Sequence, residues 1–295
     1  MNRILYSTEK YEYLEKNLNI SKGSIERKTF SDGEKYLRII DNIKNKDVYI
    51  LGGTISDQDL LEIYDLACAA SKYGANSINL IIPFFGYSTM ERALLKGEVV
   101  RAKTRARLLS SIPRSKAITN VFLFDLHVPG IIHYFEGDIH PIHMESNQIV
   151  KEALSRINSD NILLASPDEG RTKAVSILAK ENNLDFATAL KQREGEAISS
   201  ILVSSNIKGK DLLIFDDIIR SGGTILEAAK SYKEAGAKDI YVLTSHGIFT
   251  SDKLFKNNIV KKVFSSNSHP NSLNHKEVEI LDISKIIMEK INENL

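Results

Sequence analysis

The sequence predicts an α/β fold made of two similar domains, each a mainly parallel sheet flanked by helices. Short apolar runs alternate along the 295-residue chain with longer segments whose apolar residues recur at helical spacing. Each half also contains a helix that ends in Gly-Ala, at 74–75 and at 236–237, before a short polar link and a strand. Such alternation is typical of β-α-β units and hence of parallel sheets. We expect the domains to span residues 1–148 and 149–295.

The elements of the first domain follow one another as strand, helix, strand, helix and strand. The run "DVYILGG" (47–53) predicts the first strand, and the apolar spacing of 57–75 predicts an amphipathic helix that ends near a glycine. A strand over 77–86, a helix over 98–112 and a strand over 120–127 follow. The helices are long enough to serve as crossovers between parallel strands.

The second domain repeats this order with more elements. We predict strands over 161–170, 184–193, 210–217 and 239–247, helices over 171–183 and 224–237, and a closing strand end and helix within 279–295. Gly, Pro or Asp residues stand at the ends of several of these strands, where they indicate turns. The two halves are therefore expected to share one architecture.

Composition and charge limit the kinds of partner. The 39 Lys and Arg residues balance 38 Asp and Glu residues, so the net charge of +1 gives no reason to expect binding to nucleic acid. No apolar stretch approaches the roughly 20 residues that span a bilayer, and the N-terminus lacks the apolar core of a signal peptide. Cys68 is the single cysteine, which excludes an internal disulfide. We expect a cytoplasmic protein that binds neither membranes nor nucleic acid.

One stretch of the second domain carries the chemistry. In "LLIFDDIIRSGGT" (212–224), a buried strand is predicted to end in Asp216 and Asp217, and the next helix is predicted to open on Ser221, Gly222, Gly223 and Thr224. Ligands of open parallel sheets bind at the carboxyl ends of the strands. Glycines let the backbone approach an anion, and the helix N-terminus points N–H groups and a positive partial charge at it. The stretch therefore predicts a phosphate site.

The two acids beside this loop favour a sugar phosphate as the ligand. Carboxylates accept hydrogen bonds from the hydroxyls of a diol, and they can also hold an outer-sphere Mg²⁺. A phosphate site next to a diol site describes a ribose 5-phosphate. A plain strand end and a capping turn would also supply acids and a glycine, but the full combination is more specific.

This stretch resembles the phosphoribosyl pyrophosphate loop that type I phosphoribosyltransferases share with ribose-phosphate diphosphokinases. Five other segments are similar to the diphosphokinases and occur in that family's order over nearly the whole chain: "FSDGE" (30–34), "IPFFGYSTMER" (82–92), "FDLH" (124–127), "SPDEG" (166–170) and "KQR" (191–193). The segments "ARLLSSIP", "SGGT" and "SHGIF" look most like the plant-type class II branch. The resemblance implies two domains of the type I phosphoribosyltransferase fold.

The resemblance also implies an activity, a cofactor and partners. The family transfers a diphosphoryl group from ATP to the 1-hydroxyl of ribose 5-phosphate, which yields phosphoribosyl pyrophosphate and AMP. It uses Mg²⁺, and a neighbouring subunit completes its adenine pocket. We therefore expect Mg²⁺ as cofactor, ATP and ribose 5-phosphate as substrates, and a homo-oligomer.

The matching positions imply catalytic and sugar-binding residues. Lys191 and Arg193 match two cations on a loop that closes over the transferring phosphates, and His127 matches a histidine of the same reaction centre. The ribose-phosphate site would consist of Asp216, Asp217, Arg220, Ser221, Gly222, Gly223 and Thr224.

The ATP site is implied by residues of the first domain. Phe30 would stack on the adenine, and Asp32 or Glu34 would accept a hydrogen bond from its amine. Arg92 and His127 would contact the rest of the nucleotide.

Two residues match the metal site of the family, His127 and Asp168. The nearby His133, His140 and His143 have spacings that suggest zinc, but no cysteine lies near them and they form no recognisable ligand signature. We therefore predict magnesium and no zinc site.

Arg220 departs from the family pattern, because class I enzymes carry a third Asp there and class II enzymes a neutral residue. An Arg can grip phosphate with two hydrogen bonds. It leaves two acceptors open, ribose 5-phosphate and a larger 5′-diphosphate ester such as ADP-ribose in NAD salvage. Thr89 and Met90 replace an Arg-Gln pair of class I, which leaves the donor nucleotide open.

Two functions of a different class compete with this interpretation. A phosphoribosyltransferase would consume phosphoribosyl pyrophosphate, but such enzymes use one domain of this kind and lack "FSDGE". A non-catalytic regulator of the synthetases would be expected to lose site residues, whereas Lys191, Arg193, Asp216, Asp217 and His127 are all present.

Overall fold

The computed structural model describes residues 2–194, 197–203 and 206–294, and the side chains in these ranges outside 190–203. The chain forms two compact units, Met1–Glu145 with Ser284–Leu295, and Ser146–Ile283. The first boundary lies within three residues of the expected one. The C-terminal segment packs in the first unit, whereas the expected second domain, 149–295, included it.

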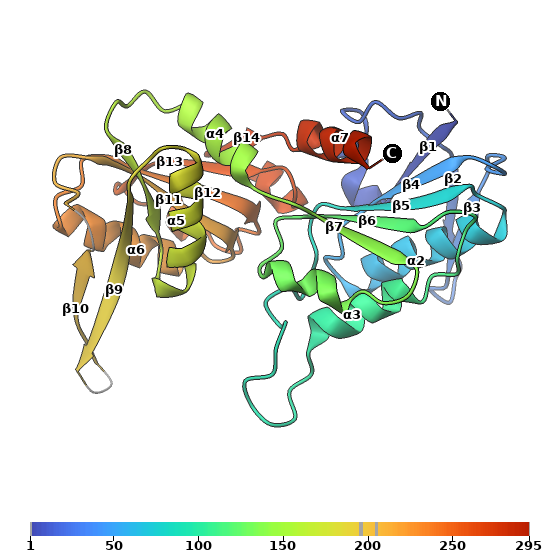
Figure 1. Cartoon of the computed structure of the whole chain (residues 1–295), viewed down its shortest axis with the longest axis horizontal. Coiled ribbons are helices and arrows are strands. Elements are labelled where there is room, and N and C mark those ends of the chain that lie inside the picture. The colour runs from blue at the N-terminus through green and yellow to red at the C-terminus, as the bar shows by residue number, and fades with distance from the viewer. Residues whose placement is uncertain (1, 195–196, 204–205, 295) are drawn as a thin grey trace. The chain divides into compact units, whose positions relative to one another are not determined.

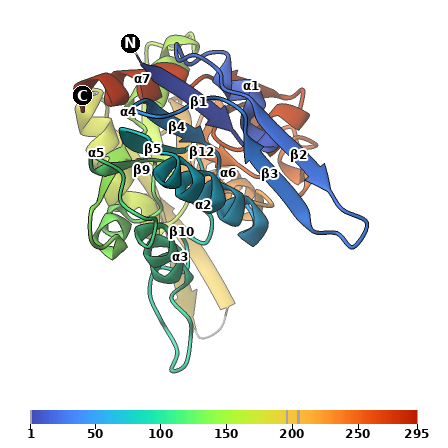
Figure 2. The same ribbon diagram turned by 90° about the vertical axis from the view of Figure 1, so that its right-hand side faces the viewer.

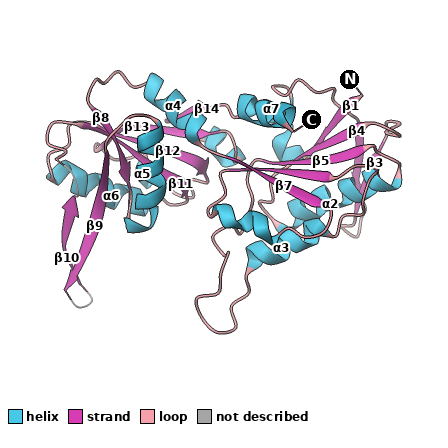
Figure 3. Cartoon of the chain, in the orientation of Figure 1, coloured by secondary structure: helices cyan, strands magenta, loops and turns pink. Residues whose placement is uncertain are grey.

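The first unit is built on a fully parallel five-stranded sheet in the order β1-β4-β5-β6-β7 (Figures 1 and 3). The strands are β1 (Arg3–Ser7), β4 (Asp47–Leu51), β5 (Ser77–Ile82), β6 (Thr119–Phe124) and β7 (Ile139–Met144). A separate antiparallel hairpin consists of β2 (Ile25–Thr29) and β3 (Lys35–Ile39). The helices are α1 (Glu12–Glu15), α2 (Asp57–Lys72), α3 (Arg101–Ser110) and α7 (Ser284–Glu293).

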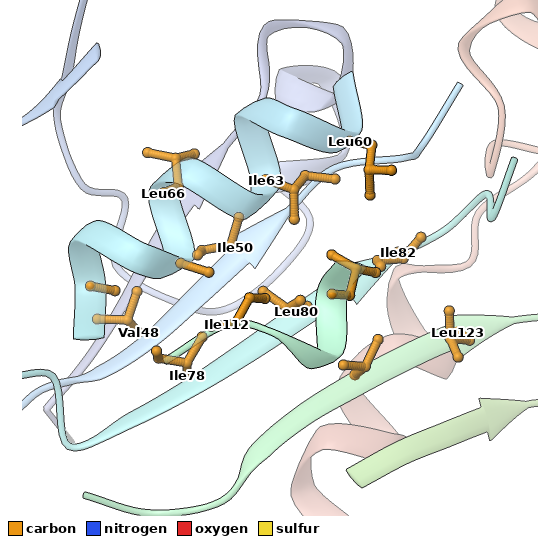
Figure 4. Packing of buried hydrophobic residues seen from close by; sticks show 14 of the residues in the cluster. Val48, Ile50, Leu60, Ile63, Leu66, Ile78, Leu80, Ile82, Ile112 and Leu123 are labelled. Carbon is orange, nitrogen blue, oxygen red and sulfur yellow. The ribbon is translucent and has the colours of Figure 1, made fainter. Parts of the chain in front are cut away.

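Helix α2 shows how the sequence fixes this packing. Ser56 and Asp59 form a reciprocal capping box at its N-terminus, which satisfies backbone N–H groups that the helix leaves unpaired. Its apolar face, including Leu60, Ile63 and Leu66, packs on Ile50 and Leu80 of the sheet (Figure 4). Strand residues alternate between the two faces, so every second residue of β4 and β5 enters this core.

The second unit contains a seven-stranded sheet in the order β10-β9-β8-β11-β12-β13-β14. All pairs are parallel except β9 with β10. The strands are β8 (Ile162–Ser166), β9 (Phe186–Glu194), β10 (Ala197–Val203), β11 (Asp211–Ile219), β12 (Ile240–Gly247), β13 (Val260–Ser266) and β14 (Val278–Leu281), and the helices are α4 (Asn147–Ser155), α5 (Thr172–Glu181) and α6 (Gly223–Glu234). Both units thus confirm the predicted fold class.

Every strand and helix predicted from the sequence is present, mostly with shorter bounds. The predictions missed β1, β2, β3, β7, β10 and β13, and helices α1 and α4. No helix in the described ranges is both long and apolar enough to cross a membrane.

Candidate functional site

The acid pair lies inside a strand rather than at its end. The prediction ended this strand at residue 217, but β11 continues to Ile219. Asp217 is only 3% exposed and Asp216 is partly buried. Carboxylates are rarely buried unless a partner compensates their charge.

The partner is Arg171, which sequence reasoning did not identify. Its Nε lies 3.2 Å from Oδ1 of Asp216, and its Nη2 pairs with Oδ1 of Asp217. The side chain of Arg171 is 16% exposed. One cation therefore binds both members of the pair, which explains how two adjacent acids can occupy a mostly buried strand.

The loop after β11 has the geometry that an anion site requires. Gly222 adopts a left-handed φ of 78° and is the N-cap of α6, which begins at Gly223. A Cβ at Gly222 would lie 3.0 Å from Cβ of Leu254, so only glycine fits without a shift of the neighbouring chain. The backbone carbonyl of Arg220 accepts a hydrogen bond from the N–H of Thr250 at 2.9 Å.

The remaining loop side chains face outward. Those of Arg220, Ser221 and Thr224 belong to exposed residues. The first N–H groups of a twelve-residue helix and two exposed hydroxyls thus follow the acid pair directly. The predicted neighbourhood of Asp216, Asp217 and the glycine loop is present in the second unit.

Asp168 lies in a turn that leads toward the same acid pair. It is the N-cap of the short 3-10 helix Glu169–Arg171, and its Oδ1 accepts the backbone N–H of Arg171 at 3.2 Å. The hydroxyl of Thr172 pairs with that of Thr188 on β9 at 2.7 Å, which in turn pairs with Ser166 at 2.7 Å. Hydrogen bonds of Arg171 and Thr172 therefore connect the turn that contains Asp168 with β9 and with the end of β8.

Lys191 and Arg193 are residues of β9. In the antiparallel register they lie opposite Ile201 and Ile198 of β10. We predicted that both residues lie at the end of a strand, next to a flexible loop. Both are part of β9, which extends to Glu194. Their side chains lie outside the described residues.

The "FSDGE" segment closes the β2–β3 hairpin. The N–H of Phe30 donates to the carbonyl of Glu34 at 2.8 Å, and the N–H of Glu34 donates to Oδ1 of Asp32 at 3.0 Å. The ring of Phe30 is 52% exposed and meets Tyr36 edge-on, with 6.2 Å between the ring centroids. A large aromatic ring at an exposed tip is available for stacking.

Arg92 lies in the long loop 83–100 between β5 and α3. Its Nε is 3.3 Å from Oε1 of Glu91, and the side chain is 74% exposed. The hairpin tip and this loop protrude from different parts of the first unit (Figures 1 and 2). The predicted nucleotide residues therefore occupy separate segments of the single chain.

His127 lies just past β6 in a turn with unusual backbone geometry. Asp125 continues the strand pairing by donating its N–H to the carbonyl of Met144 at 2.8 Å, and then adopts a φ of 39°. This conformation is uncommon outside glycine. The next N–H, that of Leu126, donates to Nε2 of His143 on β7 at 3.0 Å.

His143 therefore serves as a hydrogen-bond acceptor for the turn that presents His127. Burial lowers the pKa of His143, and Lys290 acts in the same direction, whereas Asp125 and Glu145 oppose the shift. A lowered pKa keeps the imidazole neutral near pH 7, and only an unprotonated Nε2 can accept a hydrogen bond. No pattern in the sequence predicted this contact.

The residues present fit a magnesium ion that arrives with substrate phosphates. Within the described part of the chain, no cluster of three or more His, Cys, Asp and Glu side chains is arranged to hold a metal. Mg²⁺ is commonly bound through one or two carboxylates together with phosphate oxygens and water. Asp168 is partly buried, next to the acid pair's partner Arg171, and can supply such a ligand.

Comparisons with known protein families match both units. Residues 6–112 match the family model described as the N-terminal domain of ribose phosphate pyrophosphokinase. Residues 165–294 match the model described as the phosphoribosyl synthetase-associated domain.

Curated proteins and solved structures agree. A ribose-phosphate pyrophosphokinase of Ralstonia nicotianae is 30% identical over 81% of this chain and 75% of its own length. One of Saccharolobus solfataricus is 29% identical over 94% of both chains. The crystal structure of a phosphoribosylpyrophosphate synthetase from Mycobacterium smegmatis, 23% identical, covers all of both chains with a TM-score of 0.86 and shares the fold.

Proposed function

Because the chain belongs to the ribose-phosphate pyrophosphokinase family, we propose that it transfers a diphosphoryl group from ATP to the 1-hydroxyl of ribose 5-phosphate. The products are phosphoribosyl pyrophosphate and AMP. The observation that carries this proposal is the acid pair Asp216–Asp217 followed by the left-handed Gly222 and the start of α6, within the segment that matches the family.

The second unit supplies the sugar site in this proposal. The carboxylates of Asp216 and Asp217 accept hydrogen bonds from the ribose hydroxyls, and the loop 221–224 binds the 5′-phosphate with backbone N–H groups and the hydroxyls of Ser221 and Thr224. Arg220 adds a cation at the edge of that phosphate site.

Catalysis rests on position and charge. The 1-hydroxyl attacks the β-phosphorus of ATP in line, the bond from that phosphorus to the oxygen of AMP breaks, and negative charge grows on the leaving oxygen and the transferring group. Lys191 and Arg193 lie on β9 and counter this charge, which stabilises the transition state more than the bound substrates. Asp168 of the second unit would supply a carboxylate ligand to Mg²⁺, which would neutralise phosphate charge, and the resemblance implies a metal contact for His127 of the first unit as well.

In this proposal the first unit binds the nucleotide, and a second subunit completes the binding site. Phe30 stacks on adenine, Asp32 or Glu34 accepts from the amine, and Arg92 and His127 contact the rest of ATP. The exposed hairpin tip and the separate loop that carries Arg92 support a site completed by a neighbouring copy of the chain, so we propose a homo-oligomer. Both substrates carry several charges and do not cross membranes unaided, so we propose that the reaction takes place in the cytoplasm.

Product analysis tests the proposal. Purified protein with Mg²⁺ and ATP is offered ribose 5-phosphate, ADP-ribose or no acceptor, and AMP is followed by chromatography. We expect stoichiometric AMP and phosphoribosyl pyrophosphate with ribose 5-phosphate. The comparisons give no support to ADP-ribose, and AMP formed without any acceptor would indicate hydrolysis and contradict the proposal.

Finer assignments stay predictions. The plant-type class II branch rests on "ARLLSSIP", "SGGT" and "SHGIF" alone. The phosphoribosyltransferase alternative is disfavoured because the first unit matches an N-terminal domain of the pyrophosphokinases.

The contact between His143 and Leu126 leads to a prediction about ATP. We expect His143→Leu to raise the KM for ATP by about tenfold, because the turn that presents His127 loses a partly buried hydrogen bond. His143→Gln should restore most of the affinity, since its amide oxygen can accept the same N–H. Steady-state kinetics with varied ATP at saturating ribose 5-phosphate measures both.

His140 provides the matched control. It lies on the same strand, is exposed, and contacts Asn120 with 3.2 Å between Nδ1 and Oδ1. His140→Leu should leave the KM for ATP unchanged. An equal rise in both leucine variants would show that the strand, and not the hydrogen bond to Leu126, is responsible.

A further inference from the structure

Arg171 is the feature of the sugar site that the family resemblance did not supply. Its guanidinium contacts Oδ1 of Asp216 through Nε and Oδ1 of Asp217 through Nη2. All three side chains are at least four-fifths buried. Charge-assisted hydrogen bonds from a planar guanidinium are strong and directional, so this contact constrains where both carboxylates point.

The sheet leaves room for this contact at one place. Strand β8 pairs with β11 only as far as Ile214, so Asp216 and Asp217 lie beyond the last residue of β11 that pairs with β8. Neighbouring residues of a strand normally point to opposite faces. One guanidinium binds both Asp216 and Asp217. It therefore brings together two carboxylates that the alternation of side chains along a strand would otherwise place on opposite faces of the sheet.

The backbone holds Arg171 in place from the other side. Its N–H donates to Oδ1 of Asp168, and the hydroxyl of the next residue, Thr172, is tied to Thr188 on β9. The position of the guanidinium is thus set by the turn after β8 and by β9, rather than by a long side chain alone.

We propose that Arg171 is a positioning and selectivity residue that keeps the acid pair for a neutral diol and excludes a directly bound divalent cation. This inference rests on the proposed role of Asp216 and Asp217 as the diol site. Two adjacent carboxylates alone are hard oxygen ligands of the kind that Mg²⁺ and Mn²⁺ prefer. With the guanidinium between them, their net charge falls from two negative to one, and a metal would have to displace or approach a cation.

A diol loses little from the same arrangement. Each carboxylate contacts Arg171 through Oδ1, and a carboxylate has about four lone-pair sites in all, so contact with one guanidinium is compatible with accepting a hydroxyl hydrogen. The hydroxyls of ribose are uncharged donors, so the remaining cation does not repel them. Arg171 therefore resolves the choice between diol and metal that the acids alone leave open.

Mn²⁺ is a suitable probe, because it shares the oxygen preference of Mg²⁺ and is detected directly by electron paramagnetic resonance. The full-length chain is titrated without nucleotide, and the KM for ribose 5-phosphate and the kcat are measured at saturating Mg-ATP. Lys173→Gln is the matched control, since it removes an exposed cation from the same helix start.

We expect Arg171→Gln to gain one Mn²⁺ site per chain that binds about tenfold more tightly than any in the wild type, and to raise the KM for ribose 5-phosphate by about tenfold. Lys173→Gln should change neither. The additional substitution Asp217→Asn should abolish the new Mn²⁺ site, which locates it at the acid pair.

The variant Arg171→Lys separates the effect of the positive charge from that of the guanidinium geometry. It also provides the test if Arg171→Gln does not fold. Lysine keeps the charge but lacks the planar fork, so we expect it to exclude Mn²⁺ while the KM for ribose 5-phosphate stays raised. The proposal is overturned if Arg171→Gln gains no Mn²⁺ site, if Lys173→Gln gains the same one, or if Arg171→Lys restores the wild-type KM. The Mn²⁺ titration needs no turnover, so it remains informative if the wild type releases no AMP with ribose 5-phosphate, the result that would refute the proposed function itself.

Discussion

Replacing Lys191 by alanine is expected to lower kcat by roughly 10²–10³-fold. The ammonium group is proposed to meet negative charge that develops only as the diphosphoryl group moves, so its loss should affect the transition state more than the bound substrates. The KM values for ATP and ribose 5-phosphate should change by only a few-fold. Initial rates of AMP formation with each substrate varied in turn measure both quantities.

Lys180 provides the control for this prediction. It is an exposed lysine near the end of α5 in the same unit. Lys180→Ala removes the same charge from the second unit and should leave kcat unchanged. If Lys191→Ala retains wild-type turnover, or if it fails only through a raised KM, the proposed transition-state role is wrong.

Gly222→Ala is expected to raise the KM for ribose 5-phosphate by at least about tenfold. The new methyl group must tolerate a φ of 78° and lies 3.0 Å from Cβ of Leu254, so the loop 221–224 has to move. Such a movement would tilt the first N–H groups of α6 away from the position proposed for the 5′-phosphate. Binding of ribose 5-phosphate by calorimetry gives the same quantity without turnover.

Gly209 separates loop displacement from general backbone strain. Its φ is 74°, but a Cβ there would meet nothing within 4 Å. Both alanine variants should therefore lose about 1–2 kcal/mol of stability from the left-handed backbone. Only Gly222→Ala should lose affinity for the sugar phosphate, and equal affinities in the two variants would contradict the assignment of this loop.

The sequence predicted most of the sheet because its signals are local. The apolar run of β11 and the glycines at the start of α6 each act within a few residues. The end of β11 was misplaced for a long-range reason. We predicted that the strand ends at Asp216 and Asp217, and only the fold shows that Arg171 binds both of them.

The same limit explains what was missed around His127. Its place after β6 follows from the motif "FDLH". The hydrogen bond that braces the turn comes from His143, which lies on the neighbouring strand. For His143 the local spacing suggested only a zinc ligand, which we rejected. No pattern in a single sequence reveals which backbone N–H will donate a hydrogen bond to a histidine.

The return of α7 to the first unit has a consequence for biosynthesis. Ile286, Ile287 and Ile291 are buried against that unit, next to β6 and β7. The ribosome therefore synthesises all of the second unit, residues 146–283, before it synthesises α7, the last segment of the first unit. The first unit therefore cannot complete its packing until the end of the chain has been synthesised, and a fragment that ends at residue 145 would lack the helix that packs beside β6 and β7.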